Sequence, residues 1–231
     1  MKLLLFLFTT IVDVGLPIIL NYVLTYFGVP VILALVLSGT IPFVSVIINF
    51  NFRKQVDVTG ILSTTGFIAS TILSIIQGYV KLDILEQLNA PIISFAIGLV
   101  FLITLIPIKV GSYQLRPILY YHFKFMEMGN IKGLTEDEPI PERWERYWIT
   151  YADFRQTFIV LTAVLGFALL LDVPIRILII YITKMADRAA LVGSIVSFGY
   201  MQVFISFSVI YAKWMKKLHE KRYKVKEGSY I

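Results

Sequence analysis

Apolar residues occur in six long runs along the chain, separated by short polar segments. The runs cover approximately residues 3–27, 30–50, 58–80, 91–110, 156–182 and 189–214. Each run is close to the 20 or so residues that an α-helix needs to cross the hydrocarbon core of a bilayer. The pattern predicts an all-α fold, a polytopic transmembrane helical bundle of six spans that forms a single integral membrane domain over residues 1–231.

The first two runs are joined by the short segment "YFGVP", which predicts an antiparallel helical hairpin. Pro30 fits the opening turn of the second helix, where a missing N–H does no harm. The opening "MKLLLFLF" resembles a signal peptide, but the apolar run continues to Phe27 without a small-residue cleavage motif. We therefore expect a retained first span.

Residues 111–155 form the longest polar segment and are expected to be a cytoplasmic loop. Towards its end, aromatic residues recur at three- and four-residue spacing between charged ones: Trp144, Tyr147, Trp148, Tyr151 and Phe154. This spacing predicts an amphipathic helix before span five. Its aromatic side can lie at the membrane interface or pack against the protein's own helices, and the sequence leaves both interpretations open.

Composition and charge agree with a membrane protein. Of the 231 residues, 58% are hydrophobic and 16% charged, whereas a soluble domain is nearer one quarter charged. The net charge of +6 comes from basic residues that flank apolar runs, which favours lipid head groups over nucleic acid as the anionic partner. Cysteine is absent from the sequence, so disulfides and thiol chemistry are excluded.

The distribution of Lys and Arg predicts the orientation. With six spans, all of the 21 basic residues lie on one side except Lys81, Arg176, Lys184 and Arg188. The positive-inside rule then places both termini in the cytoplasm, an N-in/C-in arrangement. The basic tail over residues 215–231 is expected to contact anionic lipid head groups through Lys216, Lys217, Lys221 and Arg222, or to act only as a topological anchor.

Span three carries small residues at every fourth position: Gly66, Ser70, Ser74 and Gly78. Such a stripe lets a neighbouring helix approach closely, which is how helices associate in lipid. The simplest interpretation is a helix-packing stripe within one chain. Homo-oligomerisation, or packing against other membrane proteins, is the alternative.

The first span contains an intramembrane polar site. Asp13 lies near the middle of the run, and Pro17 leaves its backbone carbonyl without the usual helical partner. An ionised aspartate that faces lipid is costly, so Asp13 should face other helices or water, or be protonated. Asn21, two turns further on, lies on roughly the same face of the helix.

A second polar site lies in span five, within "LLLDVPIRIL". Asp172 and Arg176 are four residues apart and can pair on one helix face, with Pro174 between them. The apolar length of this run exceeds one membrane thickness. The two charges can therefore lie near the outer interface, or the span can end near Leu171.

Motifs that carry chemistry are missing from the sequence. The only histidines, His122 and His219, make no metal-ligand pair, and neither a glycine-rich phosphate loop nor a Gly-x-Ser-x-Gly elbow occurs. We expect no enzyme activity, no metal and no cofactor.

Several short motifs follow one another along the chain: "DVGLP", "SGTIP", "RKQVDVTG" with Asp57 and Gly60, "YQLRPILYY" and "RWERYW". Their order resembles the intracellular septation protein A (septum formation inhibitor) family of small multi-pass membrane proteins, in its broader branch of unknown function. The resemblance implies a role in cell-envelope and septum integrity, and it provides no catalytic residues.

Two functions are consistent with the sequence. The first is a membrane protein without catalysis that organises or supports a membrane or cell-envelope process. The alternative is a small transporter or channel that uses the intramembrane carboxylate of Asp13.

Overall fold

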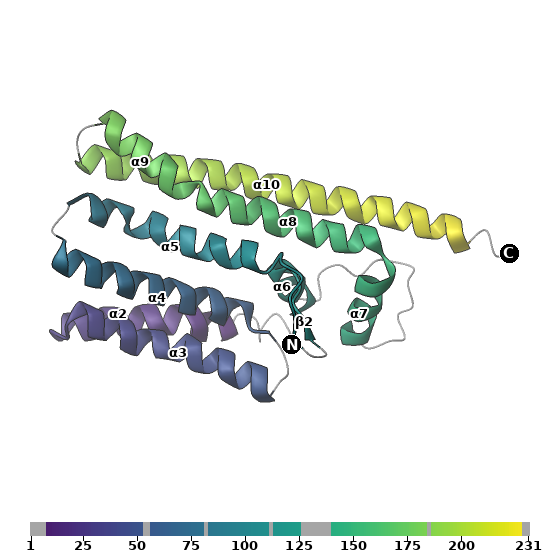
Figure 1. The fold of residues 1–231 in the computed structure, drawn as a ribbon, viewed down its shortest axis with the longest axis horizontal. Helices are drawn as coiled ribbons and strands as arrows, with labels where there is room; N and C mark the ends of the chain where they lie inside the picture. The colour runs from purple at the N-terminus through teal and green to yellow at the C-terminus, as the bar shows by residue number, and fades with distance from the viewer. Residues whose placement is uncertain are drawn as a thin grey trace. The chain divides into compact units, whose positions relative to one another are not determined.

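The computed structural model of the chain describes residues 8–52, 56–80, 83–110, 113–125, 140–183 and 186–227, which are mostly helical (Figure 1). The helices are η1 (Ile11–Gly15), α2 (Leu16–Tyr26), α3 (Val31–Phe52), α4 (Val58–Tyr79), α5 (Asp83–Ile103), α6 (Ile118–Phe125), α7 (Ile140–Thr150), α8 (Ala152–Leu170), α9 (Asp172–Thr183) and α10 (Ala186–Glu227). The two-residue strands β1 (Lys109–Val110) and β2 (Tyr113–Gln114) pair antiparallel. The all-α prediction is confirmed.

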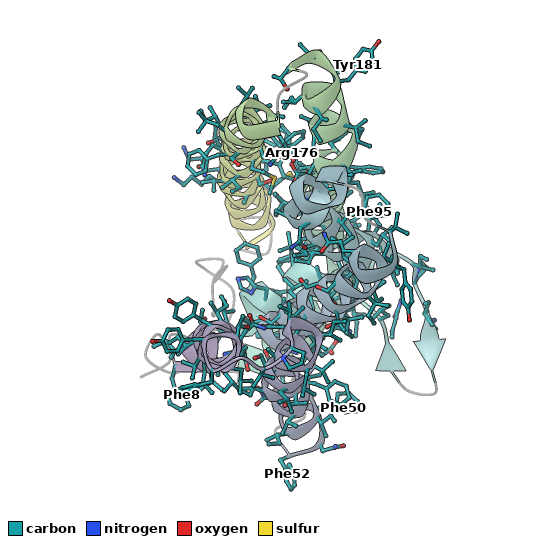
Figure 2. All side chains as sticks on the ribbon, turned by 90° about the vertical axis from the view of Figure 1, so that its left-hand side faces the viewer. Phe8, Phe50, Phe52, Phe95, Arg176 and Tyr181 are labelled. Atoms are coloured by element: carbon teal, nitrogen blue, oxygen red, sulfur yellow. The ribbon has the colours of Figure 1, made fainter. Side chains whose placement is uncertain are left out.

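Within these described residues, five helical stretches are long and apolar enough to cross a membrane. They are Phe8–Tyr26, Val31–Phe52, Val58–Tyr79, Ala152–Thr183 and Leu191–Met215. Many large apolar side chains on them are exposed, and Figure 2 shows Phe50, Phe52 and Tyr181 pointing away from the ribbon. Such a surface needs hydrocarbon around it, so the chain is an integral membrane protein.

The remaining predicted span differs from expectation at both ends. We expected residues 91–110, whereas α5 begins at Asp83 and ends at Ile103, with a shorter apolar stretch over Leu88–Ile103. After Ile103 the chain turns, and the hydroxyl of Thr104 accepts a hydrogen bond from the backbone N–H of Ile118 at 3.0 Å. Pro107 cannot continue a helix, which explains why the apolar sequence beyond Ile103 is not helical.

The fifth predicted run, residues 156–182, starts earlier and is interrupted. Helix α8 begins at Ala152, and Leu171 separates it from α9. Pro174 lacks the N–H that would bond to the carbonyl of Leu170, which disturbs the helix at this point.

The chain divides into two compact units. The first comprises Met1–Val100 with Gly166–Tyr200, and the second comprises Phe101–Leu165 with Met201–Ile231. In the first unit, α3 packs against both α2 and α4, and η1 contacts both α3 and α4. The predicted hairpin of α2 and α3 is present. Gly28 has a φ of +82° in its turn, and the N–H of Val29 bonds to the carbonyl of Leu24 at 3.0 Å.

Two glycines lie at close helix contacts of the first unit. A methyl group at Gly98 would lie 2.9 Å from the carbonyl oxygen of Gly166, and one at Gly39 would lie 2.9 Å from the Cβ of Phe67. Within the predicted packing stripe, Gly66 makes an ordinary contact with Ile93, and Gly78 faces open space. The packing role of the stripe stays a prediction.

In the second unit, the predicted amphipathic helix is α7. Its aromatic residues Trp144, Tyr147 and Trp148 are buried, as is Phe154 at the start of α8, whereas Tyr151 is half-buried. The ring of Tyr120 in α6 lies 4.9 Å from that of Trp148 and 5.4 Å from that of Trp144, centroid to centroid. Of the two interpretations, packing against the protein's own helices is the one that the structure shows.

Candidate functional site

The polar site of the first span lies in a wider helical turn. Residues Ile11–Gly15 form a π-helix in which the N–H of Leu16 donates to the carbonyl of Ile11, five residues earlier. Pro17 lacks the N–H that would bond to the carbonyl of Asp13, so a regular α-helical pattern is not available here. Such π-bulges are frequent at functional sites.

Asp57 provides the second carboxylate of the site. It is the N-cap of α4, and its Oδ1 accepts the N–H of Gly60 at 2.9 Å. Its Oδ2 accepts two more hydrogen bonds from α3, one from Ser45 Oγ at 3.0 Å and one from Asn49 Nδ2 at 2.7 Å. Three donors therefore surround the Asp57 carboxylate.

Asp13 lies against this network and is completely buried, with 0% of its surface exposed. Its carboxyl interacts with the side chains of Ser45 and Asp57. Neither of its oxygens, however, makes a hydrogen bond of good geometry. Two carboxyl groups are thus brought together, and only that of Asp57 accepts hydrogen bonds of good geometry.

The site lies near the beginning of α4. Asp13 lies against Asp57, the residue that caps the first turn of this helix. Residues 1–7 lie outside those that the structure describes, so the expected position of Asp13 near the middle of its span stays a prediction.

The structure brings Ser45 and Asp57 to Asp13, rather than Asn21. The amide nitrogen of Asn21 is buried without a partner, two turns further along α2. On the adjacent helices, the hydroxyls of Ser38 in α3 and Thr64 in α4 are also buried without a partner. Buried polar groups without hydrogen bonds are few in native proteins, so each of these groups needs an explanation. Other buried polar atoms of the described residues, such as Thr162 Oγ1 in α8, also lack a partner.

The second predicted site joins α9 to α10. Asp172 is buried, and its Oδ1 accepts a hydrogen bond from Ser197 Oγ at 2.6 Å, while the Tyr200 hydroxyl also bonds to its carboxyl. The guanidinium of Arg176 donates to the carbonyl oxygen of Ala189 at 3.4 Å, and Figure 2 shows Arg176 between the two helices. This site ties the two helices together through the hydrogen bonds of the Asp172 carboxylate and the Arg176 guanidinium.

A basic and aromatic cluster lies between α6 and α7 in the second unit. Arg116 forms an ion pair with Glu145 and donates to the hydroxyl of Tyr120 at 2.6 Å. Burial raises the pKa of Tyr120 and lowers those of His122 and Lys124. Because the pKa of His122 lies below its ordinary value of 6.5, this side chain is neutral near pH 7.

The predicted lipid contacts lie along α10. Lys217 is exposed, and the side chains of Lys216, Lys221 and Arg222 lie outside those that the structure describes. Among the described residues, no group of three or more His, Asp or Glu side chains could hold a metal ion.

Sequence reasoning missed the partners of Asp13. Ser45 and Asn49 are three and seven residues beyond Pro42, on the buried face of α3, and Asp57 follows 44 residues after Asp13 in the chain. The available signal was Asp57 with Gly60, an N-cap residue three positions before its backbone partner. No local pattern connects that cap to Asp13. Comparison with models of known protein families, with curated proteins and with solved structures finds no match for this chain.

Proposed function

We propose that this protein spans the membrane six times with both termini in the cytoplasm, and that it transports or couples a small cation through the pair Asp13 and Asp57. The observation that carries the proposal is Asp13, completely buried with both carboxylate oxygens unpartnered. An ionised carboxylate in that state is expensive, so a site of this kind is expected to take up a cation. Its place near the beginning of α4 gives the cation a short way in from one side.

Proton and monovalent-cation flux into liposomes that contain the purified protein tests this function. The expected result is flux under a pH or ion gradient in the wild type and none in Asp13→Asn, because the substitution keeps the shape and removes the exchangeable charge. Asp172→Asn is the matched control, since the Asp172 carboxylate has hydrogen-bond donors and its substitution should leave flux unchanged. Equal flux in the wild type and in Asp13→Asn contradicts the proposal.

The orientation has its own test, helped by the absence of cysteine from the sequence. Tyr181→Cys near the end of α9 and Lys217→Cys in α10 each introduce a single thiol at an exposed position. With six spans and cytoplasmic termini, a membrane-impermeant thiol reagent labels Tyr181→Cys in intact cells. It labels Lys217→Cys only after the membrane is opened.

A non-catalytic protein that organises a membrane or cell-envelope assembly is the second candidate, and the resemblance to the septation protein A family belongs with it. The observation that favours it is the role of Asp57, which caps α4 and cross-links it to Ser45 and Asn49, as a purely structural network would. If the protein only organises an assembly, no pH or ion gradient should drive proton or cation flux into the liposomes. Asp13→Asn would then change only thermal stability.

The basic tail is proposed to contact anionic lipid from the cytoplasmic side in either case. Charge near the surface of an anionic leaflet contributes about 1 kcal/mol per Lys or Arg. Replacing Lys216, Lys217, Lys221 and Arg222 by Gln should therefore reduce the anionic lipid that co-purifies with the protein. Unchanged lipid content would reject this partner.

A further inference from the structure

The burial of Asp13 restricts which cation the site can hold. Its side chain is 0% exposed, so a sphere the size of a water molecule reaches neither oxygen. A hard metal cation needs several oxygen ligands arranged around it and the space to place it among them. A proton needs one oxygen and no additional volume.

The donors around the site also argue against a metal ion. The amide nitrogen of Asn49 points at Asp57, 2.7 Å from Oδ2, and the same nitrogen lies 3.3 Å from Ser45 Oγ. The hydroxyl of Ser45 donates to Asp57 as well. Donors directed into the site favour an anion at Asp57 and leave few free lone pairs for a metal ion.

We infer that Asp13 and Asp57 form a carboxylate pair that holds one exchangeable proton, carried by Asp13 while Asp57 stays ionised. Two carboxylates in contact cannot both ionise easily, and the one without hydrogen bonds of good geometry is the one that takes the proton. The protonated Asp13 gains an O–H that can donate to Asp57 or Ser45, which removes the unpartnered state of its carboxyl. The inference deepens the proposed function by naming its cation, and it does not depend on transport.

Charges from the surrounding helices do not compete with this assignment. Helix η1 packs against α2, α3 and α4. The sequences of these three helices contain no Lys, Arg, Asp or Glu, and their titratable residues are Tyr22, Tyr26 and Tyr79. Within the described part of this region, Asp57 is the one charged side chain that Asp13 meets.

The test is the thermal stability of the full-length protein in detergent as a function of pH, for the wild type and Asp13→Asn. The folded wild type binds one proton more than the unfolded chain, so its melting temperature should fall relative to Asp13→Asn as pH rises. Other titrating groups, such as His122, contribute equally to both proteins and cancel in the difference. A difference in melting temperature between the two proteins that does not change with pH overturns the inference. Failure of Asp13→Asn to fold also overturns it, because asparagine imitates the neutral, protonated acid.

Asp57→Asn provides the second variant. Without the neighbouring negative charge Asp13 should release its proton more easily, so the loss of stability should begin at a lower pH than in the wild type. An infrared band of a protonated carboxylic acid is expected in the wild type and should be missing in Asp13→Asn. Failure to find this band contradicts the inference.

Sodium is distinguished from a proton at a fixed, high pH by comparing sodium chloride with choline chloride. Equal melting temperatures support a proton site, whereas stabilisation by sodium that disappears in Asp13→Asn assigns the site to sodium and overturns the inference. None of these measurements requires flux. If the stability difference between the wild type and Asp13→Asn depends on pH but no flux is found, the proton pair is supported and transport is rejected. If flux is found but the stability difference does not depend on pH, transport is supported and the proton pair is rejected.

Discussion

Asp13 in η1 and Asp172 at the start of α9 are both buried, and each is followed by a proline within one turn, but their surroundings differ. Asp172 accepts hydrogen bonds from Ser197 and Tyr200 on the neighbouring helix. Asp13 faces a carboxylate and makes no hydrogen bond of good geometry. The same residue type thus has two physical roles. Where donors saturate it, aspartate joins helices, and where they are missing, it is available for an exchangeable cation.

The largest effect should come from removing the saturated aspartate. Asp172→Ala leaves two half-buried hydroxyls without their acceptor and the buried Arg176 without a nearby negative charge, for a loss of about 3–5 kcal/mol in unfolding free energy. Denaturant unfolding in detergent micelles measures it. Asp172→Asn keeps an acceptor and should lose less, and Asp13→Asn should lose least of the three. A greater loss in Asp13→Asn than in Asp172→Ala would break the comparison.

Substitution of Gly193 tests how tightly α10 packs against Arg176 of α9. A methyl group there would lie 1.9 Å from Nη1 of Arg176, so Gly193→Ala must displace a buried guanidinium. We expect a loss of about 2–3 kcal/mol. Gly199→Ala in the same helix is the matched control, because nothing lies within 4 Å of its added methyl. Equal stability of the two variants would show that Arg176 is not held in place.

Ser197→Ala removes one of the donors to Asp172. Tyr200 remains as a second donor, so the expected loss of unfolding free energy is about 1–2 kcal/mol. Ser197→Thr keeps the hydroxyl and serves as its control. A Ser197→Ala protein as stable as the wild type would mean that the network does not depend on this bond.

Ser38→Ala should have the smallest effect, on the side of Asp13. Its hydroxyl is buried without a partner, so removing it gives up no hydrogen bond and relieves an unsatisfied group. Unfolding free energy should stay the same or rise by about 1 kcal/mol. A clear loss of stability would show that Ser38 has a partner in the membrane, and the contrast with Ser197 would disappear.

The sequence predicted helix positions well because the period and length of apolar runs are local properties. The expected runs at residues 30–50 and 58–80 match α3 and α4 to within two residues. The ends of helices were less predictable where apolar residues continue beyond the last helical residue. Leu105, Ile106 and Ile108 continue the apolar sequence beyond Ile103. The turn depends on Pro107 and on a hydrogen bond between Thr104 and Ile118, which are distant in sequence.

The candidate sites could be predicted only in part, for the same reason. Asp13 was recognisable as a carboxylate in an apolar run, whereas its contact with Asp57 depends on how η1 packs against α3 and α4. Asp172 and Arg176 suggested a pair within one helix. In the structure, the hydrogen bonds of Asp172 come from residues of α10, and Arg176 donates to the carbonyl of Ala189, which also lies in α10. Spacing along one helix cannot reveal partners on another.

The π-helical turn at Ile11–Gly15 determines the direction in which the side chains before it point around the helix axis. Relative to a regular α-helix, the turn holds one additional residue, and each residue of an α-helix advances the side-chain direction by about 100°. Deleting Gly15 would remove the additional residue and would swing Asp13, with everything before it, about a quarter-revolution around the axis. One inserted amino acid is thus enough to decide whether this carboxyl group looks inward at Asp57 or outward into lipid.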